Sequence, residues 1–225
     1  MRPYRVGAVA SFVLAVQFLL TLVWIIVSWP PEGLSGLVDA MGAYYRERVD
    51  EPFAFAAMNL YNCSFGVTAL TLAVVLRRQF SDYPLGTDFA VASITAAATM
   101  YVASGVVPLI AAPPLAEAGD EAALRVVEGV SAGLLLAGTM ASGFALVVFG
   151  VLALNSRRLP TPLCLLIVLS GSIEIVEWGS AGLLVLDPIF GTVWTAWLGS
   201  QLWADRVSGA TRVELGAAAE GGVAR

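Results

Sequence analysis

The chain contains 225 residues, of which 58% are hydrophobic, and its mean hydropathy is +0.81. Soluble domains are typically about 45–50% apolar, so this composition argues against a water-soluble fold. The net charge of −5 and the pI of about 4.7 argue against a nucleic-acid partner, because binding to phosphates requires a basic surface.

Two residue types that carry much of enzyme chemistry are missing. The chain has no histidine, which excludes imidazole bases, histidine haem ligands and histidine metal sites. All 12 basic residues are arginines, so neither a retinal Schiff base nor a Ser-Lys dyad can form. We therefore favour a protein without a cofactor or metal that is not an enzyme, although carboxylates, arginine, tyrosine and cysteine leave enzyme chemistry open.

Six long apolar stretches fill most of the chain. A helix needs about 20 mostly apolar residues to cross about 30 Å of hydrocarbon, and lipid demands that its backbone groups bond within the helix. The sequence therefore predicts an all-α polytopic membrane bundle of six transmembrane helices, forming a single domain over residues 1–206. The predicted spans are Val6–Trp29, Phe53–Leu76, Phe89–Ala112, Gly129–Leu154, Thr161–Leu186 and Pro188–Trp203.

The arginines predict the orientation of this bundle. Nine of them lie before the first span or after the second, fourth and sixth spans, and only three lie in the other links. The positive-inside rule places the nine in the cytoplasm, together with both termini. Arginine without lysine, in a chain rich in alanine, glycine and valine, is typical of a GC-rich prokaryotic genome. We therefore expect a prokaryotic cytoplasmic (inner) membrane.

The links between the spans carry further signals. Residues 34–49 have apolar side chains at helical spacing, which predicts a short outer interfacial helix, with an ordinary loop as the alternative. Pro113-Pro114 predicts the end of the third helix, and residues 117–125 predict a second short outer helix. Asp187-Pro188 predicts a tight outer link between the last two spans. The composition of residues 207–225 predicts a flexible cytoplasmic tail.

Two acidic residues in the fifth span are the main candidates for function. Glu174 and Glu177 are three residues apart and so share one helix face, and Trp178 follows Glu174 by four residues. A charge near mid-membrane costs about 2.5–3.5 kcal/mol on insertion scales, so both should face the bundle interior and hold a proton between them. The functional interpretation is a proton, cation or amine site. The structural alternative is a protonated pair hydrogen-bonded to neighbouring helices.

Polar residues on three other spans lie at a similar predicted depth and could complete a pocket that opens outward. Each also fits the role of a hydrogen bond between packed helices. We expect Tyr44, Tyr45 and Trp178 to close over a cationic or amine ligand. The predicted ligand-binding set is Glu174, Glu177, Trp178, Asn59, Asn62, Tyr101 and Gln17.

The last third of the chain carries a resemblance. Residues 156–160 (Ser-Arg-Arg-Leu-Pro) precede the fifth span, Ser170-Gly171 lies within it, Pro188 opens the sixth, and Trp194 and Trp197-Leu198 follow. This stretch resembles the last two helices of a widespread prokaryotic six-helix membrane family of unknown function. The resemblance implies a fold and no activity. That family often carries an acid shortly before the tryptophan, and residues 191–196 contain none.

Three functional classes remain open from the sequence. The first is a small transporter or solute-binding unit that uses the glutamate pair. The second is a non-catalytic subunit or assembly factor of a larger membrane complex, with other membrane subunits and the lipid bilayer as its partners. The third is a carboxylate-dependent membrane enzyme that acts on lipophilic substrates.

Overall fold

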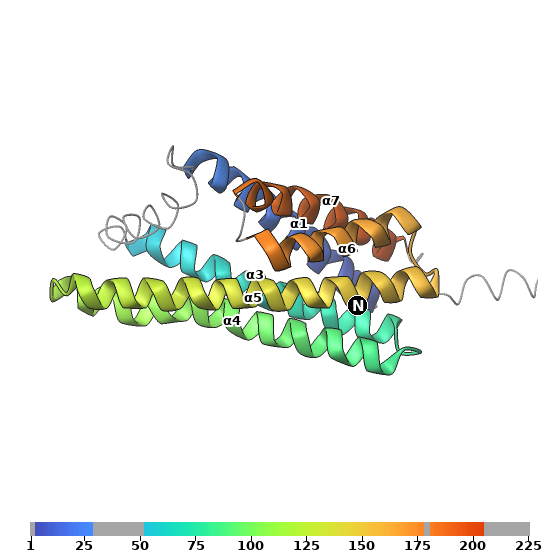
Figure 1. Ribbon diagram of the computed structural model, residues 1–225, viewed down its shortest axis with the longest axis horizontal. Coiled ribbons are helices and arrows are strands. Elements are labelled where there is room, and N and C mark those ends of the chain that lie inside the picture. Colours follow the sequence, from blue (N-terminus) through green and yellow to red (C-terminus); the bar gives the residue numbers. More distant parts are fainter. Residues whose placement is uncertain (1–2, 29–51, 178–180, 205–225) are drawn as a thin grey trace, which may run out of the picture.

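A computed structural model describes residues 3–28, 52–177 and 181–204, which form six α-helices (Figure 1). The helices are α1 (Pro3–Ser28), α3 (Pro52–Gln79), α4 (Pro84–Glu117), α5 (Glu121–Ser156), α6 (Thr161–Val176) and α7 (Ala181–Trp203). The all-α prediction is confirmed for these residues. The predicted interfacial helix at 34–49 and the predicted tail at 207–225 lie outside the described part of the chain.

The helix lengths and outer faces are those of a membrane protein. Five helices, α1, α3, α4, α5 and α7, are long and apolar enough to cross a membrane. The sixth, α6, is apolar but has only 16 residues, or about 24 Å at 1.5 Å per residue. On α1, Val16, Leu20 and Val27 are 56%, 53% and 79% exposed, as expected of side chains that face lipid.

The bundle is built from two groups of helices. The helices α3, α4, α5 and α6 pack against one another in chain order and form a four-helix half, whereas α1 and α7 pack side by side as a two-helix half (Figure 1). The halves meet where α1 contacts α3, and over a smaller area where α6 contacts α7. We call the α6–α7 contact the seam.

Small residues allow α5 and α6 to touch backbone to backbone. A Cβ atom added to Gly143 would lie 2.6 Å from the carbonyl oxygen of Gly171, and one added to Gly171 would lie equally close to the oxygen of Gly143. Such close approach is typical of helix pairs in membranes. The sequence also predicts close helix packing along a stripe of small residues on α5, namely Gly133, Gly138, Ser142 and Gly143. Gly138 does pack against α4, but a Cβ on Gly133 would meet no described neighbour within 4 Å.

The long helices α4 and α5 correct two predictions about the outer links. They have 34 and 36 residues, about 51 and 54 Å, and α4 continues through Pro113-Pro114. The two prolines lie in the last turns, where their missing N–H groups leave only two carbonyls without a helical partner. Residues 117–125 form no separate helix, because they hold the end of α4, a turn and the start of α5. Asp120 caps α5 by accepting a hydrogen bond from the Ala123 N–H at 3.0 Å.

The last two helices correct a third prediction. The fifth span was expected to run to Leu186, but α6 ends at Val176 and α7 begins at Ala181. Asp187 and Pro188 therefore lie inside α7 and not in an outer link. Proline fixes φ near the helical value, and within the first turns of a helix it removes only one hydrogen bond, so α7 accommodates it.

A buried carboxyl cluster between α6 and α7

The two glutamates of α6 point into the bundle, as the sequence indicates. Glu174 is 2% exposed and Glu177, which follows the last residue of α6, is 5% exposed. Ser172 and Val176 on the other side of the same helix are exposed. The three-residue spacing therefore places both carboxyl groups on the buried face, about 20–24 Å along α6 from its first residue.

A third buried acid comes from α7. Asp187 is 8% exposed and interacts electrostatically with both Glu174 and Glu177. It was expected to lie in an outer link, and its position in α7 overturns that expectation. The carboxyl groups of α6 and α7 thus form one cluster that spans the seam. We call Glu174, Glu177 and Asp187 the carboxyl cluster.

Hydroxyl groups on two helices contact the carboxyl cluster. Ser142 on α5 interacts with Glu174, and Ser170 on α6 interacts with Asp187. The Trp194 indole of α7 donates to the Ser170 hydroxyl at 3.1 Å and so links the two sides of the seam. One oxygen of Glu174 (Oε2) and one of Asp187 (Oδ1) are buried without a hydrogen-bond partner among the described residues.

Tyr101 on α4 is the predicted companion that the structure brings to the acids. Its side chain is 5% exposed, and it lies within electrostatic range of all three members of the carboxyl cluster. Its hydroxyl group forms a long hydrogen bond of 3.4 Å with Thr139 on α5. A weakly bound phenol at this place can exchange its partner for a water molecule or a nearby carboxyl group.

Gln17 belongs to a neighbouring network between α1 and α3. It is 6% exposed, its Nε2 donates to the Ser64 hydroxyl at 2.8 Å, and its Oε1 has no partner among the described residues. The adjacent Phe18 leads back toward the cluster, because Phe18 and Phe65 meet edge to face at 5.2 Å, as do Phe65 and Tyr101. Gln17 therefore belongs to a separate network, and the rings of Phe18, Phe65 and Tyr101 connect its helix to the acids.

Two other predicted residues, Asn59 and Asn62, lie on α3. Asn59 is buried between α3 and α4, and its Nδ2 donates to the Phe55 carbonyl oxygen at 2.9 Å, one turn earlier on its own helix. Asn62 is half-buried on α3. Trp178 lies outside the described residues, and so do Tyr44 and Tyr45, so the predicted aromatic closure is not tested.

A central cavity of about 40 Å³ begins at the carboxyl cluster. Among the described residues that line it, Glu174 contributes a carboxyl group and Ser142 a hydroxyl group. The other lining residues are mainly apolar and belong to all six described helices and to the α3–α4 and α5–α6 turns. The cavity extends from Glu174 toward Phe80 and Leu159, which lie in the α3–α4 and α5–α6 turns. The sequence predicted a pocket in the opposite half, toward the outer links.

The chain matches no protein-family model, no curated protein and no solved structure. The resemblance of residues 156–203 to a six-helix family therefore stays a prediction. The carboxyl cluster is the structural basis for a proposed function.

Two further observations limit what the cluster can bind. Among the described residues, no three His, Cys, Asp or Glu side chains converge closely enough to hold a metal ion. Every described arginine lies near a helix end or in a turn, so none of these cations reaches the cluster. The acids therefore face one another, hydroxyl groups and a small cavity.

Several contributors were missed from the sequence. Asp187 was predicted to lie in a link because proline follows it. Ser142 was predicted to serve helix packing, as one of the small residues of α5. Ser170 and Trp194 carried no polar pattern that would single them out. The signal that could have found Asp187 is its spacing from Trp194, since seven residues are two helical turns and place both side chains on one face.

Proposed function

We propose that this protein is a proton-binding membrane carrier, with the carboxyl cluster as the site where the proton is held. One observation carries the proposal. The Glu174 carboxyl group is 2% exposed, leaves Oε2 without a described partner, and lines the central cavity. A buried acid with an unused oxygen beside a cavity is the arrangement expected of an intramembrane proton relay.

The size of the cavity favours a proton over a larger ligand. A water molecule needs about 10–15 Å³ by this measure, so a cavity of about 40 Å³ has room for about three. Such a space suits water or an ammonium-sized ion at the Glu174 end and excludes an ordinary solute. Metal binding is disfavoured because the described acids do not converge as metal ligands do.

The seam supplies a means of coupling protons to movement. The three carboxyl groups lie within electrostatic range of one another in a low-dielectric site, so they repel one another when ionised, and a bound proton relieves the repulsion. Glu174 and Glu177 belong to the four-helix half and Asp187 to the two-helix half, and α6 and α7 share only a small contact. Loss of a proton would therefore push the halves apart, and uptake of a proton would let them close.

The proposal includes six crossings with both termini on the arginine-rich face. The six described helices and the distribution of arginines support it, with α6 as the shortest crossing. Reporter fusions at Tyr83 and Ala118 test it, because the first lies between α3 and α4 and the second between α4 and α5. We expect a cytoplasmic signal at Tyr83 and an outer signal at Ala118. Signals from the same side would overturn the topology.

Two measurements test proton binding without knowledge of a co-substrate. Infrared spectra of the purified protein should contain the carbonyl band of a protonated carboxylic acid, and Glu174→Gln should remove it. Vesicles that contain the protein and a trapped pH-sensitive dye should acidify under an imposed potential, and Glu174→Gln should abolish this flux. Asp88→Asn is the matched control, since Asp88 is exposed and pairs with Arg77 at 2.7 Å. A band and a flux that both survive Glu174→Gln would refute the proposal.

A second candidate function, a subunit of a larger membrane complex, is favoured by one feature of α5. Gly129 and Gly133 are spaced as in the GxxxG motif of associating membrane helices, and a Cβ on either would meet no described neighbour within 4 Å. An unused surface of this kind fits a second transmembrane helix. Cross-linking in mild detergent, with and without Gly133→Leu, tests this alternative.

A further inference from the structure

The cavity has a second end, far from the carboxyl cluster. Phe80 lines the cavity there and is only 1% exposed, and Leu159 lies beside it on the α5–α6 turn. Phe80 comes directly after α3, at the same end of the bundle as Arg77 and Arg158. The cavity thus points toward the arginine-rich face.

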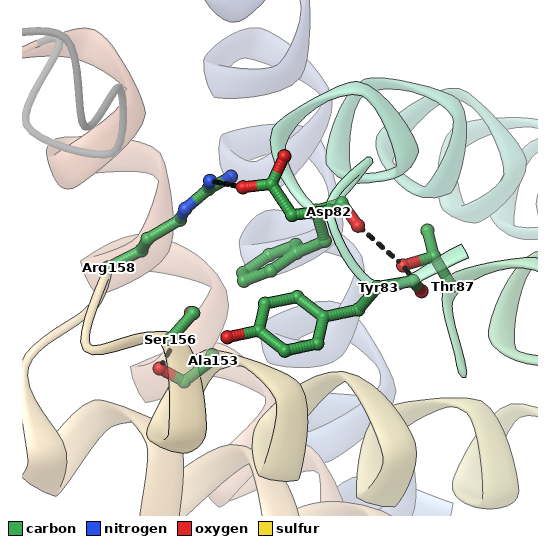
Figure 2. Close-up of polar contacts among 7 residues, drawn as sticks. Asp82, Tyr83, Thr87, Ala153, Ser156 and Arg158 are labelled. Carbon is green, nitrogen blue, oxygen red and sulfur yellow. Dashed lines mark hydrogen bonds and ion pairs between the residues drawn. The ribbon is translucent and has the colours of Figure 1, made fainter. Parts of the chain in front are cut away.

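A charged pair lies beside the Phe80 ring. The Arg158 guanidinium carbon is 5.9 Å from the centre of that ring. Arg158 also forms an ion pair with Asp82, which connects the α5–α6 turn to the α3–α4 turn (Figure 2). The side chains of Arg158 and Asp82 are 23% and 65% exposed. Phe80 therefore contacts both the cavity and an ion pair that solvent reaches.

Hydrogen bonds hold the backbone around Phe80, and its ring packs against Phe149 with 6.4 Å between the ring centroids. The Phe80 N–H donates to the Leu76 carbonyl oxygen at 3.0 Å. The Phe80 carbonyl oxygen accepts from the Tyr83 N–H at 3.0 Å and from the Thr87 hydroxyl at 2.9 Å. These bonds fix the turn, so rotation of the ring is the simplest movement that opens the cavity.

We infer that the cavity opens toward the arginine-rich face through a gate, in which the Phe80 ring is the plug and the Arg158–Asp82 ion pair is the latch. The inference rests on the proposed function, since it gives the cavity beside Glu174 a route to water. Exposed ion pairs contribute little to stability, so this latch breaks easily and suits a gate that opens repeatedly. The cation–π contact of Arg158 holds the ring in place while the ion pair is intact.

Thiol labelling tests the gate separately from proton binding. Ala73 lines the cavity and is 2% exposed, and it lies seven residues before Phe80, about 10 Å deeper. In full-length protein with Cys63→Ala and Cys164→Ala, the variant Ala73→Cys supplies one thiol inside the cavity. The probe is the silver ion, a thiol-reactive cation of about the size of a water molecule, which fits a cavity with room for about three waters. The rate at which it modifies this thiol reports how often the gate is open.

The variants separate the plug from the latch. Phe80→Ala removes the ring and should raise the labelling rate by more than about tenfold, given the volume removed. Asp82→Asn keeps the shape and breaks only the ion pair, so a rise of about two- to fivefold is expected. Asp88→Asn breaks the exposed Arg77–Asp88 pair on the same face and should change nothing.

The outcomes decide the inference. No rise with Asp82→Asn in a folded variant, or an equal rise with Asp88→Asn, would overturn the latch. No rise with Phe80→Ala would overturn the gate, and Phe80→Leu serves if the alanine variant does not fold. A rise in labelling together with proton flux that survives Glu174→Gln would keep the gate and reject the proton site. Flux that depends on Glu174 with unchanged labelling would keep the site and reject the gate.

Discussion

The two sides of α6 make contacts of opposite character. Against α5, its backbone comes so close at Gly171 that a Cβ atom would lie 2.6 Å from the Gly143 carbonyl oxygen. Against α7, the contact is small and contains the carboxyl cluster and the Trp194–Ser170 hydrogen bond. The contact with α5 is extensive and closely packed, and the contact with α7 is small and brings acids of two helices together.

This difference indicates which part of the bundle moves. Interdigitated packing resists displacement because every shift loses van der Waals contacts. A small polar contact changes more readily, since its strength depends on the charge of the acids. A carrier needs both kinds of contact, one that keeps α6 attached to a frame and one that responds to a proton. The four predictions below test this contrast, in order of decreasing effect on stability.

The largest effect is expected on the tight side of α6. Gly143→Leu places a side chain where its first carbon already meets a backbone oxygen, and no rotamer relieves that overlap. We expect a loss of at least about 3 kcal/mol of stability, the upper end of overpacking costs. Thermal unfolding in detergent measures it, with Gly133→Leu on the same helix as the control. Equal midpoints for the two variants would mean that α5 and α6 do not touch at Gly143.

The second prediction concerns charge at the seam. Asp187→Asn keeps the shape of the side chain and removes one of three acids that repel one another, so stability at neutral pH should rise. Burial of one ion costs several kcal/mol even after relaxation of the protein, so we expect its removal to gain about 2 kcal/mol. Chemical unfolding measures the gain, and Asp88→Asn on the surface should show none. A clear loss of stability would mean that Asp187 has a cationic partner and that repulsion does not govern the seam.

The sequence predicts most of the frame and only part of the site. The long spans follow from hydropathy, and the inward direction of Glu174 and Glu177 follows from the cost of exposing a carboxylate to lipid. Helix ends are harder to predict, because a proline ends a helix in water but not always in a packed bundle. For this reason the proline after Asp187 predicts a link at the wrong place. Gly179 is the better sequence signal for the end of a helix.

The cavity and its plug depend on contacts that no local pattern reveals. Phe80 and Arg158 are 78 positions apart and meet only because two turns end at the same face. Ser142 reaches Glu174 through the glycine contact between α5 and α6. Asn59 and Asn62 are three residues apart and so share one face of α3, which suggested a row of polar groups. The Asn59 Nδ2, however, donates to the Phe55 carbonyl oxygen of its own helix. Such distinctions require the packing of the helices.

The third prediction weakens the seam without touching an acid. Trp194→Phe keeps most of the buried ring and removes the indole N–H that donates to Ser170. We expect a loss of about 1 kcal/mol, typical of one hydrogen bond. Ser170→Ala should cost more, because it also removes the interaction with Asp187, and the double variant should cost less than the sum, because both changes remove the bond between Trp194 and Ser170. Additive losses would show that the two side chains do not stabilise the seam together.

The smallest effect on stability is expected where α5 extends past the end of α6. Gly129→Leu and Gly133→Leu fill a surface that meets no described neighbour within 4 Å, so together they should change the stability of the isolated bundle by no more than about 0.5 kcal/mol. The same double variant should abolish cross-links to a partner helix if that surface serves assembly. Unfolding and cross-linking are measured on one preparation, which separates the two effects. Unchanged cross-linking would remove the support for a subunit role. A large loss of stability would mean that this surface of α5 is covered within the protein itself and belongs to the fold.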